Sequence, residues 1–193
     1  MNRFILASIS PRRIQLLRDS KFDPEIIPPE VTELDCDFLT PSEIAMFNAY
    51  RKAVTVANRY PEAVVLAADT VVALGWETFG KPKDHEEARR MLQNLVGKTH
   101  DVITGVALVA PGRPIVLEGE LSAVKFRLLS DGEIDAYLNS IHPFDKAGGY
   151  AAQDSPDAVI ECVNGSFTNV VGLPMELVLP LLASAGIHPA ASC

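Results

Sequence analysis

The stretch EAVVLAADTVVAL (residues 62–74) carries the strongest structural signal in this 193-residue chain. Its near-continuous run of apolar residues predicts a strand that is buried on both faces. Asp69 stands in the middle of the run, where an unpaired carboxylate is costly to bury. We therefore expect Asp69 to have a function, either as a ligand of a divalent cation or as a base that takes a proton from water. The alternative, that the strand ends at Asp69 and the aspartate caps a turn, is weakened by the apolar VVAL that follows.

Predicted helices and strands alternate around this stretch. We expect residues 3–8 (RFILAS) to form a short apolar strand, residues 100–110 to form a longer one, and residues 115–129 to form one long strand or two. Helices are expected after four capping residues: Ser10, Thr40, Asp84 and Ser130. Thr40, Asp84 and Ser130 are each followed three residues later by a glutamate, which is the pattern of a capping box. Asn164-Gly165 suggests a hairpin, and residues 174–186 a final helix that Pro180 kinks or shortens. This order predicts an α/β fold with a mixed sheet.

The composition limits the classes of protein to consider. The chain is 48% hydrophobic and 22% charged, as expected for a globular protein, and we treat residues 1–193 as a single domain. A formal net charge of −8 argues against sequence-independent binding of nucleic acid. No apolar run reaches the roughly 18 residues of a membrane span. The cysteines are far apart and odd in number, which favours free thiols in a reducing cytosol: Cys36, Cys162 and Cys193.

The stretch LASISPRR (residues 6–13) places two arginines in the first turn of a predicted helix. Cations are disfavoured at a helix N-terminus by about 0.3–1 kcal/mol each, and the free N–H groups of that turn attract anions. Arg12 and Arg13 therefore predict a bound anion. The alternative is a pair of solvated arginines that tolerate the helix dipole.

Three further stretches contain candidate ligand-binding residues. GWETFGKP (75–82) nearly matches a phosphate-binding loop, but Pro82 stands where the magnesium-binding hydroxyl belongs, so only Lys81 is kept as a phosphate contact. Lys52 lies among small helical residues that allow a close approach to another surface. In DKAGGYAAQ (145–153), paired glycines let the backbone approach a ligand, and Gln153 offers both a donor and an acceptor. The alternative for Lys52 and Lys81 is that both are solvated, and the alternative for residues 145–153 is a turn that binds no ligand.

Taken together, six stretches in the same order resemble the Maf family of nucleoside triphosphate pyrophosphatases: LASISPRR, AADTVV, GKPKD, EARRMLQNLVGKTHDVITGVAL, DKAGGYAAQ and NGSFTNVVGLPME. The resemblance implies hydrolysis between the α and β phosphates, giving a nucleoside monophosphate and pyrophosphate. It also implies a divalent cation (Mg²⁺ or Mn²⁺), a cytoplasmic location and a homodimer. The implied fold is an elongated mixed sheet flanked by helices, with two lobes and a central cleft, as in inosine triphosphatases.

Site roles follow from motif position in that family. Asp69 would activate water, and Glu33 would join it near the metal. The triphosphate would be held by Ser8, Arg12, Arg13, Lys52 and Lys81. Base choice would depend on Arg12, Thr70 and Gln153, and the PRR and DKAGGYAAQ stretches resemble the branch that acts on dTTP and UTP. The chain departs from the family pattern at Thr32, Ala151, Ala152 and Asp154.

Two other functions remain open from the sequence. The first is a non-enzymatic, nucleotide-binding regulator of cell division or septum formation. The second is a phosphatase of small phosphorylated metabolites, which would release orthophosphate. Release of pyrophosphate from a nucleotide separates the expected enzyme from both.

Overall fold

The structure is a computed structural model that describes residues 3–34, 36, 38–153 and 156–190. Within these residues one mixed sheet runs in the order β2-β1-β3-β5-β6-β7, and β4 pairs with β3. The strands are β1 (Phe4–Leu6), β2 (Glu25–Ile26), β3 (Val64–Leu74), β4 (Glu77–Phe79), β5 (Thr99–Val109), β6 (Val116–Phe126) and β7 (Ile160–Asn164). The first two pairs, β1 with β2 and β1 with β3, are parallel, and the other pairs are antiparallel.

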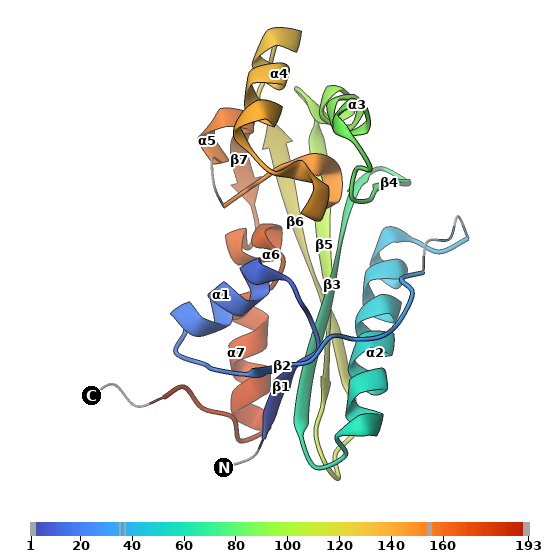
Figure 1. The fold of residues 1–193 in the computed structure, drawn as a ribbon, viewed down its shortest axis with the longest axis vertical. Coiled ribbons are helices and arrows are strands. Elements are labelled where there is room, and N and C mark those ends of the chain that lie inside the picture. The colour runs from blue at the N-terminus through green and yellow to red at the C-terminus, as the bar shows by residue number, and fades with distance from the viewer. Residues whose placement is uncertain (1–2, 35, 37, 154–155, 191–193) are drawn as a thin grey trace.

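Helices cover both faces of the long strands, which give the molecule its elongated shape (Figure 1). Figure 1 shows α2 on one side of β3 and β5, α1 and α7 on the other side, and α3 and α4 at the far end. The helices are α1 (Pro11–Asp19), α2 (Pro41–Arg59), α3 (His85–Leu95), α4 (Asp131–Ser140), α5 (Pro156–Val159), α6 (Phe167–Val171) and α7 (Met175–Ser184), with 3-10 turns η1 (Pro143–Asp145) and η2 (Ala147–Gly149). None of these described helices has the length and apolar character needed to cross a bilayer.

Side chains of β3 point alternately to the two faces of the sheet and so belong to different hydrophobic cores. Val65 and Ala67 pack toward the small face of α2, whereas Leu66 and Ala68 join a core with α1 and α7. Val72, on the same face as Leu66, belongs to a second core with α3 and α4. Because successive side chains of a strand point to opposite faces, the strand joins two lobes on one face and holds α2 on the other. The two-lobed α/β fold expected from the sequence is confirmed.

Local signals fixed most helix starts. Thr40 and Ser130 both form complete capping boxes, and Ser10 is the N-cap of α1 although its side chain makes no capping hydrogen bond. At α3 the box is incomplete. Asp84 accepts from the Glu87 N–H, but the Glu87 carboxylate accepts from the backbone N–H of Lys83.

The hairpin predicted at Asn164-Gly165 is wrong. β7 ends at Asn164, and the chain enters α6 instead, because the Ser166 hydroxyl accepts from the Asn169 N–H and caps a helix. Pro180 does not shorten the last helix, since α7 continues to Ser184. The DKAGGYAAQ stretch begins at Asp145, the last residue of the turn η1, and it contains the turn η2.

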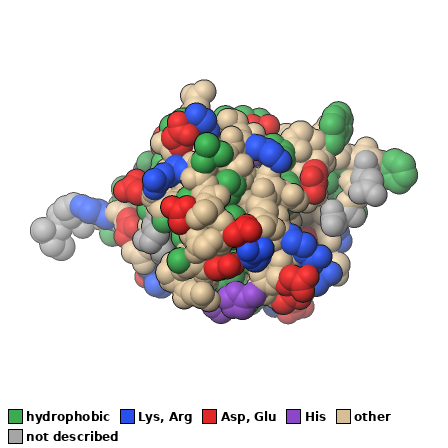
Figure 2. All heavy atoms as spheres, turned by 90° about the horizontal axis from the view of Figure 1, so that it is seen from above, with side chains coloured by type: hydrophobic (Ala, Val, Ile, Leu, Met, Phe, Trp, Pro, Cys, Tyr) green, Lys and Arg blue, Asp and Glu red, His purple; other side chains and the backbone are tan. Residues whose placement is uncertain are grey.

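The end of the molecule that carries α3 and α4 has a mixed charge. Figure 2 shows acidic and basic side chains interspersed over this face. Arg89 of α3 pairs with Asp131 and Asp135 of α4, so part of the positive charge here is balanced locally.

Candidate active site

A cavity of about 670 Å³ opens where one edge of β3 lacks a neighbouring strand. β1 pairs with β3 as far as Leu66, and β4 pairs with it only from Val72 onward. In the described part of the chain, no strand covers residues 67–71 on this edge, and the opposite edge pairs with β5. Asp69 and Thr70 line the cavity from this gap, between the two lobes. The loop before α1, the segment around Glu33 and the η1–η2 region form the other walls.

Asp69 and Lys52 form a buried ion pair at the base of the cavity. The Lys52 ammonium lies 2.5 Å from Asp69 Oδ1 and 2.5 Å from Glu33 Oε1. The Asp69 and Lys52 side chains are 9% and 8% exposed, whereas that of Glu33 is 50% exposed. Burial raises the pKa of Asp69 above its ordinary value, and the charge of Lys52 only partly opposes this rise. Burial would also raise the pKa of Glu33, but the hydrogen bond and charge of Lys52, together with the charges of Lys81 and Arg13, outweigh it and leave that pKa lowered.

The close approach of α2 to the sheet brings Lys52 to Asp69. Gly105 of β5 is the cross-strand partner of Asp69. A Cβ atom at Gly105 would lie 2.5 Å from the backbone of Ala45, so α2 rests directly on this glycine. Ala45, Ala49 and Ala53 on the same helix face are fully buried, as expected from their small size. A larger residue at any of these contacts would move Lys52 away from Asp69.

Arg13 is a buried part of the fold as well as a wall of the cavity. Its Nε donates to the Gly172 carbonyl at 2.8 Å, and one terminal nitrogen donates to the Ala68 carbonyl at 2.8 Å. The other terminal nitrogen donates to Thr70 Oγ1 at 3.0 Å. The Ala68 carbonyl lies on the open edge of β3, where the guanidinium takes the place of a strand. Burial lowers the pKa of Arg13, so its charge is costly here and most of its donors are used within the protein.

Arg12 connects the two lobes across the mouth of the cavity. One terminal nitrogen lies 2.8 Å from Asp145 Oδ2, and the other donates to the Asp145 carbonyl at 3.2 Å. Lys146 Nζ also donates to the Asp145 carboxylate, at 2.7 Å. These positive neighbours outweigh the partial burial of the carboxyl, and the pKa of Asp145 is lowered. Sequence analysis did not single out Asp145, although it begins the DKAGGYAAQ stretch.

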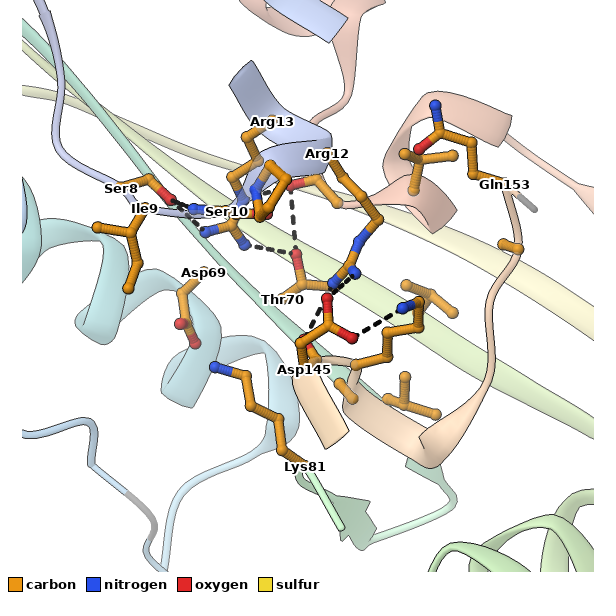
Figure 3. A pocket seen from close by; sticks show the side chains of 18 of the residues that line it. Ser8, Ile9, Ser10, Arg12, Arg13, Asp69, Thr70, Lys81, Asp145 and Gln153 are labelled. Atoms are coloured by element: carbon orange, nitrogen blue, oxygen red, sulfur yellow. Dashed lines mark hydrogen bonds and ion pairs between the residues drawn. The ribbon is translucent and has the colours of Figure 1, made fainter. Parts of the chain in front are cut away.

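The remaining predicted residues also line the cavity, as Figure 3 shows. Ser8 is buried and its hydroxyl accepts from the backbone N–H of Ser10. The Thr70 hydroxyl is 2.9 Å from that of Thr104, a fully buried residue of β5 that the sequence did not suggest. In Figure 3 the Lys81 ammonium points toward Asp69, whereas Gln153 lies beyond Arg12 at the other end of the view. Asp154, named above as a departure from the family pattern, lies outside the described residues, as does Cys193.

The donor set fits a hard divalent cation that completes its shell with substrate oxygens. In the ranges that the structure describes, no group of three or more His, Cys, Asp or Glu side chains forms a closed metal site. Glu33 and Asp69 nevertheless place a carboxylate oxygen each on the same ammonium, so these two oxygens are close together. Mg²⁺ is typically held by one or two carboxylates together with phosphates of the substrate. Lys52 occupies the position between the carboxylates where such an ion would share their charge.

The fold and the cavity define the general class. The chain matches solved structures of Ham1 proteins from Staphylococcus aureus (TM-score 0.53, 12% identity, 94% of this chain and 98% of that one) and Coxiella burnetii (TM-score 0.52, 15% identity, 96% and 100%). It is therefore an α/β protein of the Ham1 architecture, with an acid–lysine cluster and arginines at the cleft between its lobes.

The family follows from the sequence comparisons. The model of the Maf-like protein family matches residues 3–185, and the chain belongs to that family. It is 47% identical to the dTTP/UTP pyrophosphatase of Myxococcus xanthus (95% of this chain, 92% of that one) and 44% identical to the one from Thermosipho africanus (96% and 94%). The dTTP/UTP pyrophosphatase of Pyrococcus furiosus is 42% identical over 94% of this chain and 95% of its own length.

Proposed function

We propose that this protein hydrolyses nucleoside triphosphates, with dTTP and UTP as preferred substrates, to the nucleoside monophosphate and pyrophosphate. Water attacks the α-phosphorus, the bond from that phosphorus to the bridging oxygen breaks, and pyrophosphate leaves. The proposal agrees with the names of relatives that are 42–47% identical over nearly the whole chain.

The observation that carries the proposal is the buried carboxylate of Asp69 at the floor of the cavity. Its raised pKa makes it a better proton acceptor than an exposed aspartate, while the charge and hydrogen bond of Lys52 favour its ionised form. In this role Asp69 takes the proton of the attacking water. The water is then a stronger nucleophile at the moment the phosphorus–oxygen bond forms.

The positive side chains around Asp69 suit a triphosphate. Lys52 lies beside the acid pair, the Lys81 ammonium points toward the same region, and Arg12 stands at the mouth. A triphosphate carries nearly four negative charges, and preorganised cations stabilise the charge that develops on the leaving group. Because most Arg13 donors are bonded within the protein, Arg13 contributes its charge and the shape of the wall rather than a forked phosphate contact.

Glu33 and Asp69 are the proposed ligands of a divalent cation that arrives with the nucleotide. When bound, the cation polarises the phosphate and lowers the pKa of nearby water. Lys52 holds the two carboxylates close together, and its ammonium would supply a positive charge beside them for the phosphate.

Base choice is proposed to depend on Gln153, Arg12 and Thr70. The Gln153 amide can donate to a carbonyl and accept from the imide N–H that uracil and thymine present side by side. Gln153 is exposed at the cavity rim, and Arg12 lies between it and Thr70 in Figure 3. The proposals that the protein is a homodimer and is located in the cytoplasm rest only on its resemblance to the Maf family.

The test is a nucleotide panel assayed for both pyrophosphate and orthophosphate with Mg²⁺ or Mn²⁺. We expect pyrophosphate from UTP and dTTP, and a loss of at least about a hundredfold in turnover for Asp69→Asn, with a much smaller change in nucleotide binding. Activity that survives Asp69→Asn refutes the assignment of the base. Orthophosphate as the first product indicates a phosphatase, and binding without turnover indicates a regulator.

A further inference from the structure

Asn48 is a buried polar residue on the α2 face that packs against the sheet. Its side chain is almost inaccessible, with the residue only 2% exposed, and fully buried Ala45 and Ala49 flank it on the same helix face. A polar side chain in such a place is destabilising unless its groups are hydrogen-bonded. Sequence analysis assigned Asn48 no role, because one asparagine in a helix carries no motif.

Both ends of the Asn48 amide are paired with the same segment of chain. The side-chain oxygen accepts from the Leu34 N–H at 2.7 Å, and the nitrogen donates to the Leu34 carbonyl at 3.0 Å. The nitrogen also donates to Asp69 Oδ2 at 3.3 Å. The amide therefore connects the helix, the segment that carries Glu33 and the carboxylate of Asp69.

The contacts from α2 to this segment form a consecutive set. Asn48 holds Leu34, Lys52 holds the side chain of Glu33, and Arg51 donates to the Thr32 carbonyl at 2.8 Å. Residues 32–34 lie outside any helix or strand, so these side chains take the place of a regular hydrogen-bond ladder. Of the three contacts, the one from Asn48 is the most buried.

The two oxygens of Asp69 are held by residues one helical turn apart. Lys52 binds Oδ1 at 2.5 Å, and Asn48 binds Oδ2 at 3.3 Å. Residues i and i+4 of a helix lie on the same face, which explains how both reach one carboxylate. Two donors on different oxygens resist rotation of the carboxylate better than one donor, and the Asn48 donor adds no charge.

We propose that Asn48 is a positioning residue for the hydrolysis reaction. It fixes the orientation of Asp69 and the place of the Glu33 segment, so that both carboxylates face the same part of the cavity. This inference rests on the proposed function, since it concerns the residue that acts on water. Asn48 is not among the residues that line the cavity.

The kinetic test compares Asn48→Leu and Asn48→Ala with Asn58→Leu. Leucine keeps the approximate size of asparagine but cannot form the three hydrogen bonds, and alanine removes them without adding bulk. Asn58 is an exposed asparagine of the same helix and serves as the matched control. We expect both Asn48 variants to lose at least about tenfold in kcat for UTP, since misplacement of a reacting group by about 1 Å costs up to a hundredfold. KM and the affinity for the α,β-methylene analogue of UTP should change less than about threefold.

A second measurement follows the proposed contact without any turnover. The Leu34 amide donates to Asn48, so its hydrogen exchange, measured by NMR on the free protein, should be at least about threefold faster in both Asn48 variants. Asn58→Leu should leave it unchanged. A variant that does not fold, judged by circular dichroism, is set aside in favour of the other one.

The outcomes separate the two proposals. Faster Leu34 exchange with unchanged kcat shows that Asn48 only stabilises the segment and overturns the positioning role. Unchanged Leu34 exchange overturns the proposed contact itself. A proportional rise in KM with no loss of kcat places the effect in substrate binding and also overturns it. Absence of turnover in the unmodified protein with every nucleotide refutes the proposed function instead.

Discussion

His100 should make the protein sensitive to acid. The residue is 2% exposed, its Nε2 lies 3.0 Å from the hydroxyl of Tyr150, and its ring packs edge-on against Phe126 and Tyr150. Nδ1 is buried and has no hydrogen-bond partner among the residues that the structure describes. Burial lowers the pKa of His100 from 6.5 to about 4. Tyr150 lines the cavity, so protonation of His100 disturbs a wall of the candidate active site.

The direction and size of the effect follow from proton linkage. The folded protein holds His100 neutral, whereas the unfolded chain takes up a proton near pH 6.5, so unfolding is favoured as the pH falls below that value. The contribution of His100 to stability is fully present above pH 6.5 and is lost as the pH falls through about 4. With these two pKa values the loss is about 1.4 kcal/mol at about pH 5.5 and about 2.5 kcal/mol at about pH 4.5.

The measurement is urea unfolding of the unmodified protein and of His100→Gln between about pH 7.5 and pH 4.5. Glutamine can keep a hydrogen bond to Tyr150 but cannot take the charge. The signal is circular dichroism, because the single tryptophan, Trp76, is 79% exposed. We expect the unmodified protein to lose about 2–3 kcal/mol more than His100→Gln over this range, and the exposed His188→Gln to follow the unmodified protein. Parallel stability curves for the unmodified protein and His100→Gln would refute the reasoning.

Three further outcomes concern the cavity. Lys81→Ala should raise KM for UTP and make it less sensitive to salt, whereas Lys83→Ala, an exposed neighbour outside the cavity, should not; equal effects contradict a phosphate contact. Asp145→Asn removes the negative charge that competes with the triphosphate for Arg12. The KM for UTP should therefore fall a few-fold at low ionic strength and converge with the value of the unmodified protein at high salt. A higher KM at every salt concentration would instead show that Asp145 positions Arg12. Gln153→Ala should narrow the preference for UTP over CTP by roughly tenfold or more through slower UTP hydrolysis, and an unchanged ratio excludes Gln153 from base choice.

Features set by short stretches were predictable from the sequence. The capping boxes at Thr40 and Ser130 are local, and the apolar run of β3 is long enough to predict a buried strand with Asp69 inside it. The failure at Asn164-Gly165 is also local. The same dipeptide that favours a hairpin is followed by Ser166, whose capping bond to Asn169 starts a helix.

The site depends on contacts between distant parts of the chain, which local patterns do not contain. Arg13 lies in the first helical turn, as predicted. Its guanidinium, however, donates hydrogen bonds to the carbonyls of Ala68 and Gly172, which lie 55 and 159 residues further along the chain. The partner of Arg12 is likewise 133 residues away. The sequence could indicate that these arginines need acceptors, and only the fold shows which ones they have.

The contact of α2 with Gly105 makes the α2 wall of the cavity more rigid than the wall formed by α1 and η1. The helix rests on the β5 backbone with no room for a methyl group, so this wall cannot shift without breaking close contacts on both sides of Asp69. The opposite wall is joined by the Arg12–Asp145 pair, whose side chains are 23% and 42% exposed, and a pair of that kind opens for about 1 kcal/mol or less. The contact between α1 and η1 therefore separates at a lower free-energy cost than the contact between α2 and the sheet, which keeps Lys52 beside Asp69.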